Sequence, residues 1–320
     1  MNVLYIGKYP PIEGGTAAAA YWRIKKLRRF GINFEVITCF SLNDEYVIKP
    51  FVPRQHLHLI NEKTAWHIPY SQLYSERLIS EGLKLSEQIN FDLIEGCYLF
   101  PYGFGAYVIA KILNKPLIIR HAGSDLYRLS KTGDFNGLML DMINSAKLIV
   151  TYKECVKRWS ALGAHSNLYI TSRYVPDPSV FFSEGSHLDA VFLGKITDRW
   201  NRSQFDYYHS KLKKAGDISC IKVYSSERAI KEFENYFNDK GYNVIGNPFV
   251  MPSKVPEILK SAKYLLISEP PKEIPECSNC LVEGLMSGCS IIRSDKNFKY
   301  IPEMNFEKYL REQLEIYERV

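Results

Sequence analysis

The sequence predicts an α/β protein made of two doubly wound domains, each with a parallel sheet covered by helices on both faces. Short apolar runs of strand length alternate with longer amphipathic segments along most of the chain. This alternation occurs twice, on either side of a proline-containing stretch at residues 174–179. The length of 320 residues also suits two domains of ordinary size better than one.

Apolar runs and amphipathic segments define the elements of the first half. Strands are predicted at residues 3–6, 34–38, 92–94, 116–119 and 147–150. Helices are predicted at about residues 16–30, 74–89, 103–113 and 134–145. Gly31 supplies the stop signal of the first helix.

The second half repeats the pattern. Strands are predicted at residues 190–193, 220–224, 244–245, 264–267 and 290–292. Helices are predicted near residues 204–214, 227–239, 253–262 and 279–287. We therefore expect domains at residues 1–173 and 174–302, followed by a charged C-terminal helix within residues 303–320 that packs on the surface.

Composition excludes several classes of protein. Hydrophobic residues make up 46% and charged residues 24% of the chain, as in soluble globular proteins. No apolar run has the length of a membrane span, and the first residues have a strand pattern rather than that of a signal peptide. We therefore expect a cytoplasmic protein. The net charge of +6 suits an anionic ligand or an acidic surface but is too small to indicate nucleic acid.

The cysteines do not indicate a disulfide framework or a zinc site. Their number is odd and they are scattered along the chain. Cys277 and Cys280 form one CxxC pair without the further ligands that a zinc site requires. Packed thiols are therefore a simpler interpretation of this pair than a metal site or a redox site.

A glycine pair lies between the first predicted strand and helix, at Gly14 and Gly15, followed by Thr16. Glycine lets the backbone approach a ligand closely, and the N–H groups of a helix start attract a phosphate or a sugar hydroxyl. A turn followed by a helix cap explains the same residues, so both interpretations stay open.

A polar segment from Arg120 to Asp125 follows a buried strand, so we expect it at the carboxyl edge of the sheet. His121 could bind a sugar hydroxyl or transfer a proton there. Capping of the local backbone is the structural alternative.

Cations follow the first strand of the second half. Lys195 comes directly after Gly194, and Arg199 and Arg202 are close behind. Such cations would stabilise the charge on a departing nucleoside diphosphate, although a solvated basic turn would look the same. The sequence has no Asp-x-Asp motif, which fits binding of the diphosphate by these side chains without a metal.

Residues 276–292 form the most informative segment: a loop, a short helix carrying Glu283, a glycine turn and a strand. A carboxylate near the helix start can accept hydrogen bonds from two ribose hydroxyls. Glu273 and Glu276 could contact the sugar, or they could be solvated loop charges.

Taken in order, these motifs resemble the retaining glycosyltransferases of the GT-B fold, family 4 type. The resemblance spans about residues 1–295 and rests on YPPIEGG at 9–15, HAGSD at 121–125, GK at 194–195 and NCLVEGLMSG at 279–288. It implies two Rossmann-like domains facing each other across a cleft, with the acceptor side in the first domain and the nucleotide-sugar donor in the second.

The resemblance also implies a reaction and a set of residues. The reaction would be metal-independent transfer, with retention, from a UDP- or GDP-sugar to a hydroxyl acceptor in the synthesis of a cell-surface polysaccharide or glycolipid. No cofactor is expected, because the nucleotide-sugar is a substrate. The implied catalytic residues are His121, Lys195 and Glu276. The implied donor-binding residues are Gly14, Gly15, Gly194, Lys195, Arg199, Arg202, Asn279, Leu281 and Glu283. The implied acceptor-binding residues are Thr16, Tyr98 and Asp125.

The sequence departs from the family pattern in two places. Pro275 stands at the position of the first glutamate, so Glu276 is one residue closer to Glu283 than the family spacing. Trp200 stands where a phosphate-binding lysine is usual. The displaced glutamate motivates one alternative, a non-catalytic transferase-like subunit. A nucleotide-sugar 2-epimerase of the same fold is the other alternative.

The first predicted helix is basic and contains large apolar residues. Its positive residues include Lys25, Lys26, Arg28 and Arg29. They could form an ordinary solvated face or contact anionic lipid at the inner face of the cell membrane. The expected partners are thus the donor, a carbohydrate or lipid-linked acceptor and an anionic membrane, with no nucleic acid.

Overall fold

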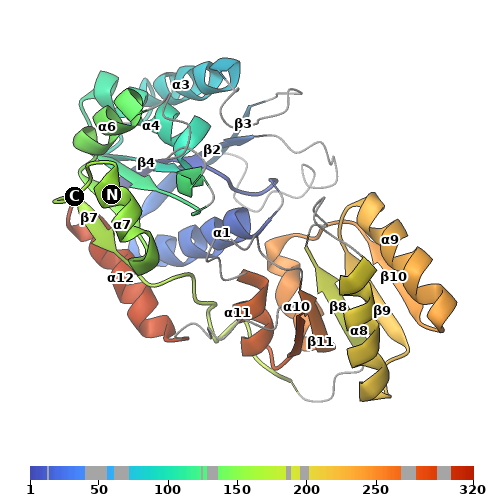
Figure 1. Cartoon of the computed structure of the whole chain (residues 1–320). Helices are drawn as coiled ribbons and strands as arrows, with labels where there is room; N and C mark the ends of the chain where they lie inside the picture. The colour runs from blue at the N-terminus through green and yellow to red at the C-terminus, as the bar shows by residue number, and fades with distance from the viewer. Residues whose placement is uncertain are drawn as a thin grey trace. The chain divides into compact units, whose positions relative to one another are not determined.

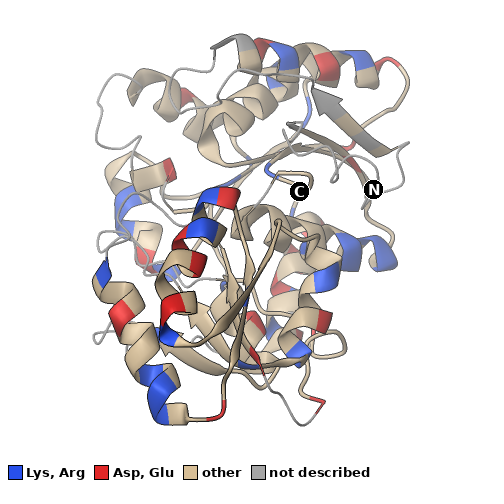
Figure 2. Cartoon of the chain, turned by 90° about the vertical axis from the view of Figure 1, so that its right-hand side faces the viewer, with Lys and Arg blue, Asp and Glu red and all other residues tan. Residues whose placement is uncertain are grey.

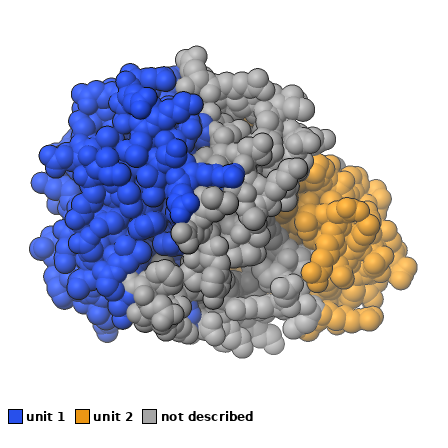
Figure 3. All heavy atoms as spheres, turned by 90° about the horizontal axis from the view of Figure 1, so that it is seen from above, with its two compact units in different colours: residues 1–173, 307–320 blue, residues 174–306 orange. Residues whose placement is uncertain are grey.

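The computed structural model describes residues 1–12, 14–39, 56–60, 72–123, 125–127, 136–184, 189–194, 202–267, 279–293 and 304–320. The chain forms two compact units, which Figure 3 shows in different colours. Unit 1 contains Met1–Arg173 and Glu307–Val320, and unit 2 contains Tyr174–Phe306. Each unit has its own parallel sheet, which confirms the predicted α/β class.

The sheet of unit 1 has seven parallel strands in the order β3-β2-β1-β4-β5-β6-β7. The strands are β1 (Asn2–Gly7), β2 (Asn33–Cys39), β3 (Leu57–Ile60), β4 (Leu93–Cys97), β5 (Leu117–Arg120), β6 (Leu148–Thr151) and β7 (Leu168–Ile170). Central β1 is a continuous apolar run because both of its faces are covered. The strand order reverses between β1 and β4, and ligands of doubly wound sheets bind beside such a switch point.

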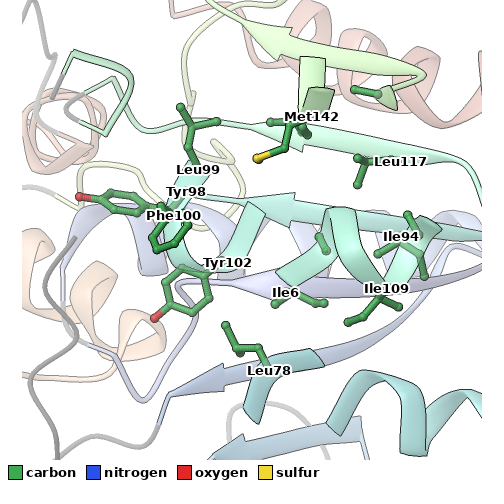
Figure 4. Packing of buried hydrophobic residues seen from close by; sticks show 14 of the residues in the cluster. Ile6, Leu78, Ile94, Tyr98, Leu99, Phe100, Tyr102, Ile109, Leu117 and Met142 are labelled. Atoms are coloured by element: carbon green, nitrogen blue, oxygen red, sulfur yellow. The ribbon is translucent and has the colours of Figure 1, made fainter. Parts of the chain in front are cut away.

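Helices cover both faces of this sheet. They are α1 (Gly15–Leu27), α3 (Gln72–Ser86), α4 (Phe104–Leu113), α6 (Asn136–Ser145), α7 (Val156–Ala161) and α12 (Phe306–Glu318). Apolar side chains of α3, α4, α6 and α7 pack together against one face, part of which Figure 4 shows. Helices α1 and α12 pack against the other face. Charged residues gather on the helices rather than on the strands, as Figure 2 shows.

The C-terminal helix α12 belongs to unit 1 and is more than a surface element. Its Ile316 and Tyr317 are buried against the sheet. The Tyr317 hydroxyl donates a hydrogen bond of 2.5 Å to Glu95 of β4. Glu95 also accepts hydrogen bonds from Arg23 of α1 and Arg120 of β5. The end of the chain is thus tied to a buried charged cluster in the sheet.

The sheet of unit 2 has five parallel strands in the order β10-β9-β8-β11-β12. The strands are β8 (Asp189–Leu193), β9 (Cys220–Tyr224), β10 (Asn243–Asn247), β11 (Ala262–Ile267) and β12 (Ser290–Arg293). The helices are α8 (Arg202–Ala215), α9 (Glu227–Phe237), α10 (Val255–Lys260) and α11 (Asn279–Met286). The core of unit 2 is rich in aromatic contacts, such as the Phe192 and Phe233 rings with centroids 4.8 Å apart. Its switch point lies between β8 and β11.

Most predicted elements are present with small differences at their ends. Strands β3 and β7 and helix α7 were not predicted. Both strands lie at edges of the sheet and are only four and three residues long, so their sequences show little periodicity. The helix predicted at 253–262 is shorter, because Pro252–Lys254 form a 3₁₀ turn and β11 already begins at Ala262.

Candidate functional site

The switch point of unit 1 brings together residues that follow β1 and β4. Lys8 follows β1, and its Nζ lies 3.7 Å from the centroid of the Tyr98 ring. Tyr98 follows β4 and has a φ of 82°, which is unusual for a residue with a side chain. Its N–H donates to the Arg120 carbonyl at 3.1 Å, and its carbonyl accepts from the Gly103 N–H at 3.0 Å. Such held, strained backbone is often found at functional sites.

The glycine turn before α1 depends on backbone conformation rather than on packing. Gly14 has a φ of 118°, and a Cβ added there would meet no atom within 4 Å. Gly14 caps α1 without a side-chain hydrogen bond, and its carbonyl accepts from the Ala18 N–H at 3.1 Å. Gly14 and Gly15 are exposed and Thr16 is half-buried. The geometry therefore suits both a capping turn and a ligand loop.

His121, the residue after β5, has both ring nitrogens engaged with protein groups. Nδ1 accepts a hydrogen bond from the Gly123 N–H at 3.1 Å, so Nε2 carries the proton and donates to Thr151 Oγ1 at 2.8 Å. Burial, with 4% of the residue exposed, lowers the pKa of His121 to about 4 even though Asp125 acts in the opposite direction. His121 thus caps the local backbone as a neutral imidazole and orders the loop after β5. Contact with a sugar stays a prediction.

Asp125 joins the same cluster from the loop after β5. It is fully buried, and its two carboxylate oxygens accept hydrogen bonds from the N–H groups of Leu99, at 2.7 Å, and Ala122, at 2.9 Å. These bonds tie the loop after β5 to the segment that follows Tyr98. The structure thus brings the predicted residues Tyr98, His121 and Asp125 to one edge of the sheet, where Asp125 holds backbone. Its contact with an acceptor stays a prediction.

In unit 2, Gly194 directly follows β8 at the switch point. Its φ of 153° is one that residues with a Cβ rarely adopt. Its N–H donates to the Tyr224 carbonyl at 3.4 Å, and its carbonyl accepts from the Ser225 hydroxyl at 2.5 Å. The chain therefore leaves β8 in a conformation that glycine permits and that neighbouring β9 holds.

Of the predicted phosphate-binding cations, Arg202 lies within the described residues. Arg202 is exposed at the first position of α8, which begins at the carboxyl edge because it follows parallel strand β8. A cation at a helix start is unfavourable by itself, and a bound anion would offset the repulsion. Lys195, Arg199 and Glu276 lie outside the described residues.

Glu283 is a buried carboxyl in helix α11, which connects the parallel strands β11 and β12. Only 3% of the residue is exposed, and its Oε1 accepts a hydrogen bond of 3.2 Å from the Tyr174 hydroxyl. Burial raises the pKa of Glu283 to about 8, although the Tyr174 hydrogen bond lowers it. Asn279 opens α11 half-buried, and Leu281 is buried in the next positions. Helix α11 thus carries a carboxyl group whose charged form is disfavoured by burial.

Sequence reasoning missed several contacts of these sites. Lys8 could have been noticed, because it directly follows the first strand and so lies at the carboxyl edge. The pairing of Tyr174 with Glu283 and of Thr151 with His121 joins residues far apart in sequence, and no local pattern signals it.

The described part of the chain contains neither a candidate metal site nor a candidate membrane span. No cluster of three or more His, Cys, Asp or Glu side chains there has the geometry of a metal site. No helix there has both the length and the apolar character needed to cross a bilayer.

No protein-family model and no curated protein sequence matches the chain. Solved structures do match. HepE of Anabaena, in complex with UDP and glucose, is 10% identical with a TM-score of 0.61, covering 91% of this chain and 80% of that chain. Sucrose-phosphate synthase from Thermosynechococcus elongatus is 10% identical with a TM-score of 0.60, covering 99% and 89%. UDP-GlcNAc 2-epimerase from Neisseria meningitidis, bound to UDP-GlcNAc, is 12% identical with a TM-score of 0.55, covering 83% and 77%. These likenesses confirm the expected GT-B fold.

Proposed function

We propose that this chain is a glycosyltransferase that takes a sugar from a nucleotide-sugar donor bound by unit 2. The observation that supports this most is the buried carboxyl of Glu283 on the helix that follows β11, beside the switch point of a GT-B fold. HepE and the 2-epimerase share that fold and hold UDP or a UDP-sugar in their solved structures. A UDP-sugar is therefore the donor that we expect.

In the proposed donor site, Glu283 accepts hydrogen bonds from the ribose hydroxyls. Gly194 lets the diphosphate approach the backbone after β8, and Lys195 with Arg199 or Arg202 neutralises the charge that develops on it. Asn279 and Leu281 of α11 line the nucleotide, and Glu276 contacts the sugar. Positioning and charge stabilisation by side chains then suffice without a metal or a cofactor.

We further propose that unit 1 binds the acceptor. Gly14, Gly15 and Thr16 lie at the start of α1, which follows β1, while Tyr98 follows β4 and His121 and Asp125 follow β5. The acceptor hydroxyl would attack from the face that the diphosphate leaves, so the anomeric configuration would be retained. A cell-surface polysaccharide or a glycolipid is the acceptor class that we propose.

A thermal-shift panel of UDP, GDP and ADP tests donor binding. A ligand that binds only the folded state at one hundred times its Kd stabilises it by about 2.7 kcal/mol, so UDP should raise the Tm. Lys195→Ala should reduce this shift. Lys214→Ala is the matched control, because Lys214 is exposed in the last turn of α8, at the opposite edge of the sheet. No shift with any nucleoside diphosphate would contradict the proposal.

The 2-epimerase is the second candidate, because the epimerase match has the same fold and a bound UDP-sugar. Incubation of a UDP-sugar without acceptor separates the two. An epimerase would release a new sugar isomer, whereas a transferase would give slow hydrolysis at most. Turnover by the purified chain would in turn exclude a non-catalytic subunit.

We also propose that the protein works in the cytoplasm, at the inner face of the cell membrane. Lys25 is exposed in the last turn of α1, and Arg29 is exposed in the 3₁₀ turn that follows, next to Phe30, which is 51% exposed. Basic and apolar side chains together favour anionic lipid. Vesicles with anionic lipid should bind the protein, and neutralising Lys25, Lys26, Arg28 and Arg29 should weaken that binding. Unchanged binding would exclude this surface.

A further inference from the structure

The chain passes from unit 1 to unit 2 between Arg173 and Tyr174, and each of these residues is anchored in its own unit. Arg173 Nε donates to the Glu154 carboxylate at 2.6 Å, and the guanidinium lies 4.7 Å from the centroid of the Tyr152 ring. Tyr174 is buried, and its hydroxyl donates to Glu283 Oε1 at 3.2 Å. The first residue of unit 2 is therefore tied directly to helix α11.

Close packing holds the backbone of α11 but leaves the Glu283 side chain to be oriented by its hydrogen bond. A Cβ added at Gly284 would lie 2.4 Å from Leu265 Cδ2, so α11 lies very close to β11 at this point. Within the described residues, the Tyr174 hydroxyl is the one hydrogen-bond partner of the Glu283 side chain. Burial favours the neutral acid, whereas the hydrogen bond from Tyr174 lowers the pKa of Glu283 and so favours the carboxylate. The carboxylate is the form with the greater capacity to accept hydrogen bonds.

We propose that Tyr174 is a positioning residue of the donor site: its hydroxyl holds the Glu283 carboxylate in the orientation that accepts the ribose hydroxyls of the nucleotide. This inference rests on the proposed function, in which Glu283 binds ribose. It links the residue at the junction of the two units to recognition of a nucleoside diphosphate. Tyr174 acts through Glu283, so its removal should alter nucleotide binding only where the Glu283 carboxylate is present.

A titration without ligand tests the contact itself. The carboxyl carbon-13 resonance of Glu283 is followed from pH 5 to pH 10 in the wild type and in Tyr174→Phe, which keeps the ring. The pKa of Glu283 should rise by about one pH unit in the variant, because a hydrogen bond to the charged form is lost. Tyr169→Phe is the matched control, because it removes the hydroxyl that donates to Glu315 at 2.9 Å in unit 1. An unchanged pKa in Tyr174→Phe would overturn the proposal.

Calorimetric UDP affinities test the role in binding. If the carboxylate is the binding form, Tyr174→Phe should weaken UDP about tenfold at pH 7 and about twofold at pH 9, since the ionised fraction of Glu283 recovers. In the Glu283→Gln background, Tyr174→Phe should leave the UDP affinity unchanged. Because each pair of proteins is compared at the same pH, protonation of UDP itself affects both members equally. Equal weakening in both backgrounds would show that the hydroxyl acts elsewhere and overturn the proposal.

The two arms also separate this inference from the proposed function. If the wild type binds no nucleoside diphosphate, the proposed function fails and the nucleotide role of Tyr174 fails with it. If the wild type binds UDP while the pKa of Glu283 is unchanged in Tyr174→Phe, the proposed function stands and the role of Tyr174 is excluded.

Discussion

Glu95 in the middle of β4 is the residue whose replacement should destabilise unit 1 most clearly. It is fully buried, and its carboxylate accepts hydrogen bonds of 2.6 Å from Arg23, 3.0 Å from Arg120 and 2.5 Å from the Tyr317 hydroxyl. Two guanidinium groups thus share one carboxylate. Arg120 Nη1 also donates to Gln313 Oε1 of α12 at 3.0 Å, so the cluster joins α1, two strands and the C-terminal helix.

The Glu95→Gln substitution removes the only negative charge in this described cluster and leaves two buried cations facing a neutral amide. Removing one partner of a buried ion pair costs about 3–5 kcal/mol, because the remaining charge is left uncompensated in the interior. For a unit of this size, a loss of about 4 kcal/mol lowers the Tm by roughly 8–16 °C. The side-chain volume hardly changes, so the loss reports charge rather than packing.

Differential scanning calorimetry of the unit 1 transition measures this loss. Glu227→Gln is the control, because Glu227 forms an exposed ion pair with Lys231 and its replacement should leave the Tm unchanged. Burial raises the pKa of Glu95, but Arg23 and Arg120 outweigh it, so the folded pKa is lower than the unfolded one. The stability that the ionised Glu95 contributes is therefore fully present above the unfolded pKa and is lost as pH falls through the folded pKa. The difference in stability between the two proteins should therefore begin to shrink as pH falls below about 4.3, the unfolded value, and should close only below the lower folded pKa. A Tm decrease of less than about 2 °C at pH 7 would refute the reasoning.

Two other substitutions probe the turns near the sites. Gly288→Ala should destabilise unit 2 by about 1–3 kcal/mol in urea unfolding, because φ is 82° and the new Cβ would lie 2.7 Å from Ser183 Oγ. Gly137→Ala, in helix α6 with no atom within 4 Å, should instead stabilise its unit slightly; equal effects would contradict the strain argument. For His121, the folded pKa of about 4 lies below the unfolded value, so protonation of the unfolded chain should remove about 3 kcal/mol between pH 7 and pH 4. His121→Asn should lack that step, and an identical pH dependence would exclude a buried neutral imidazole.

The sequence by itself determined the class of fold and the sheet edge at which the candidate residues after β5 lie. Strands such as β1 and β8 are covered on both faces and are therefore continuous apolar runs, which can be recognised without a structure. In a parallel sheet, every segment that follows a strand lies at the carboxyl edge. That rule placed His121 and Asp125 at the edge where the structure has them.

The tertiary structure alone decided which side chains meet there and in what chemical state. Local patterns report whether a residue faces the core, but they do not report which residue from a distant element faces it. The hydrogen bonds of His121 with Thr151 and of Glu283 with Tyr174 depend on the packing of whole elements, so they could not be predicted. Because burial and partners together set a pKa, the neutral state of His121 and the raised pKa of Glu283 also arise only in the folded chain.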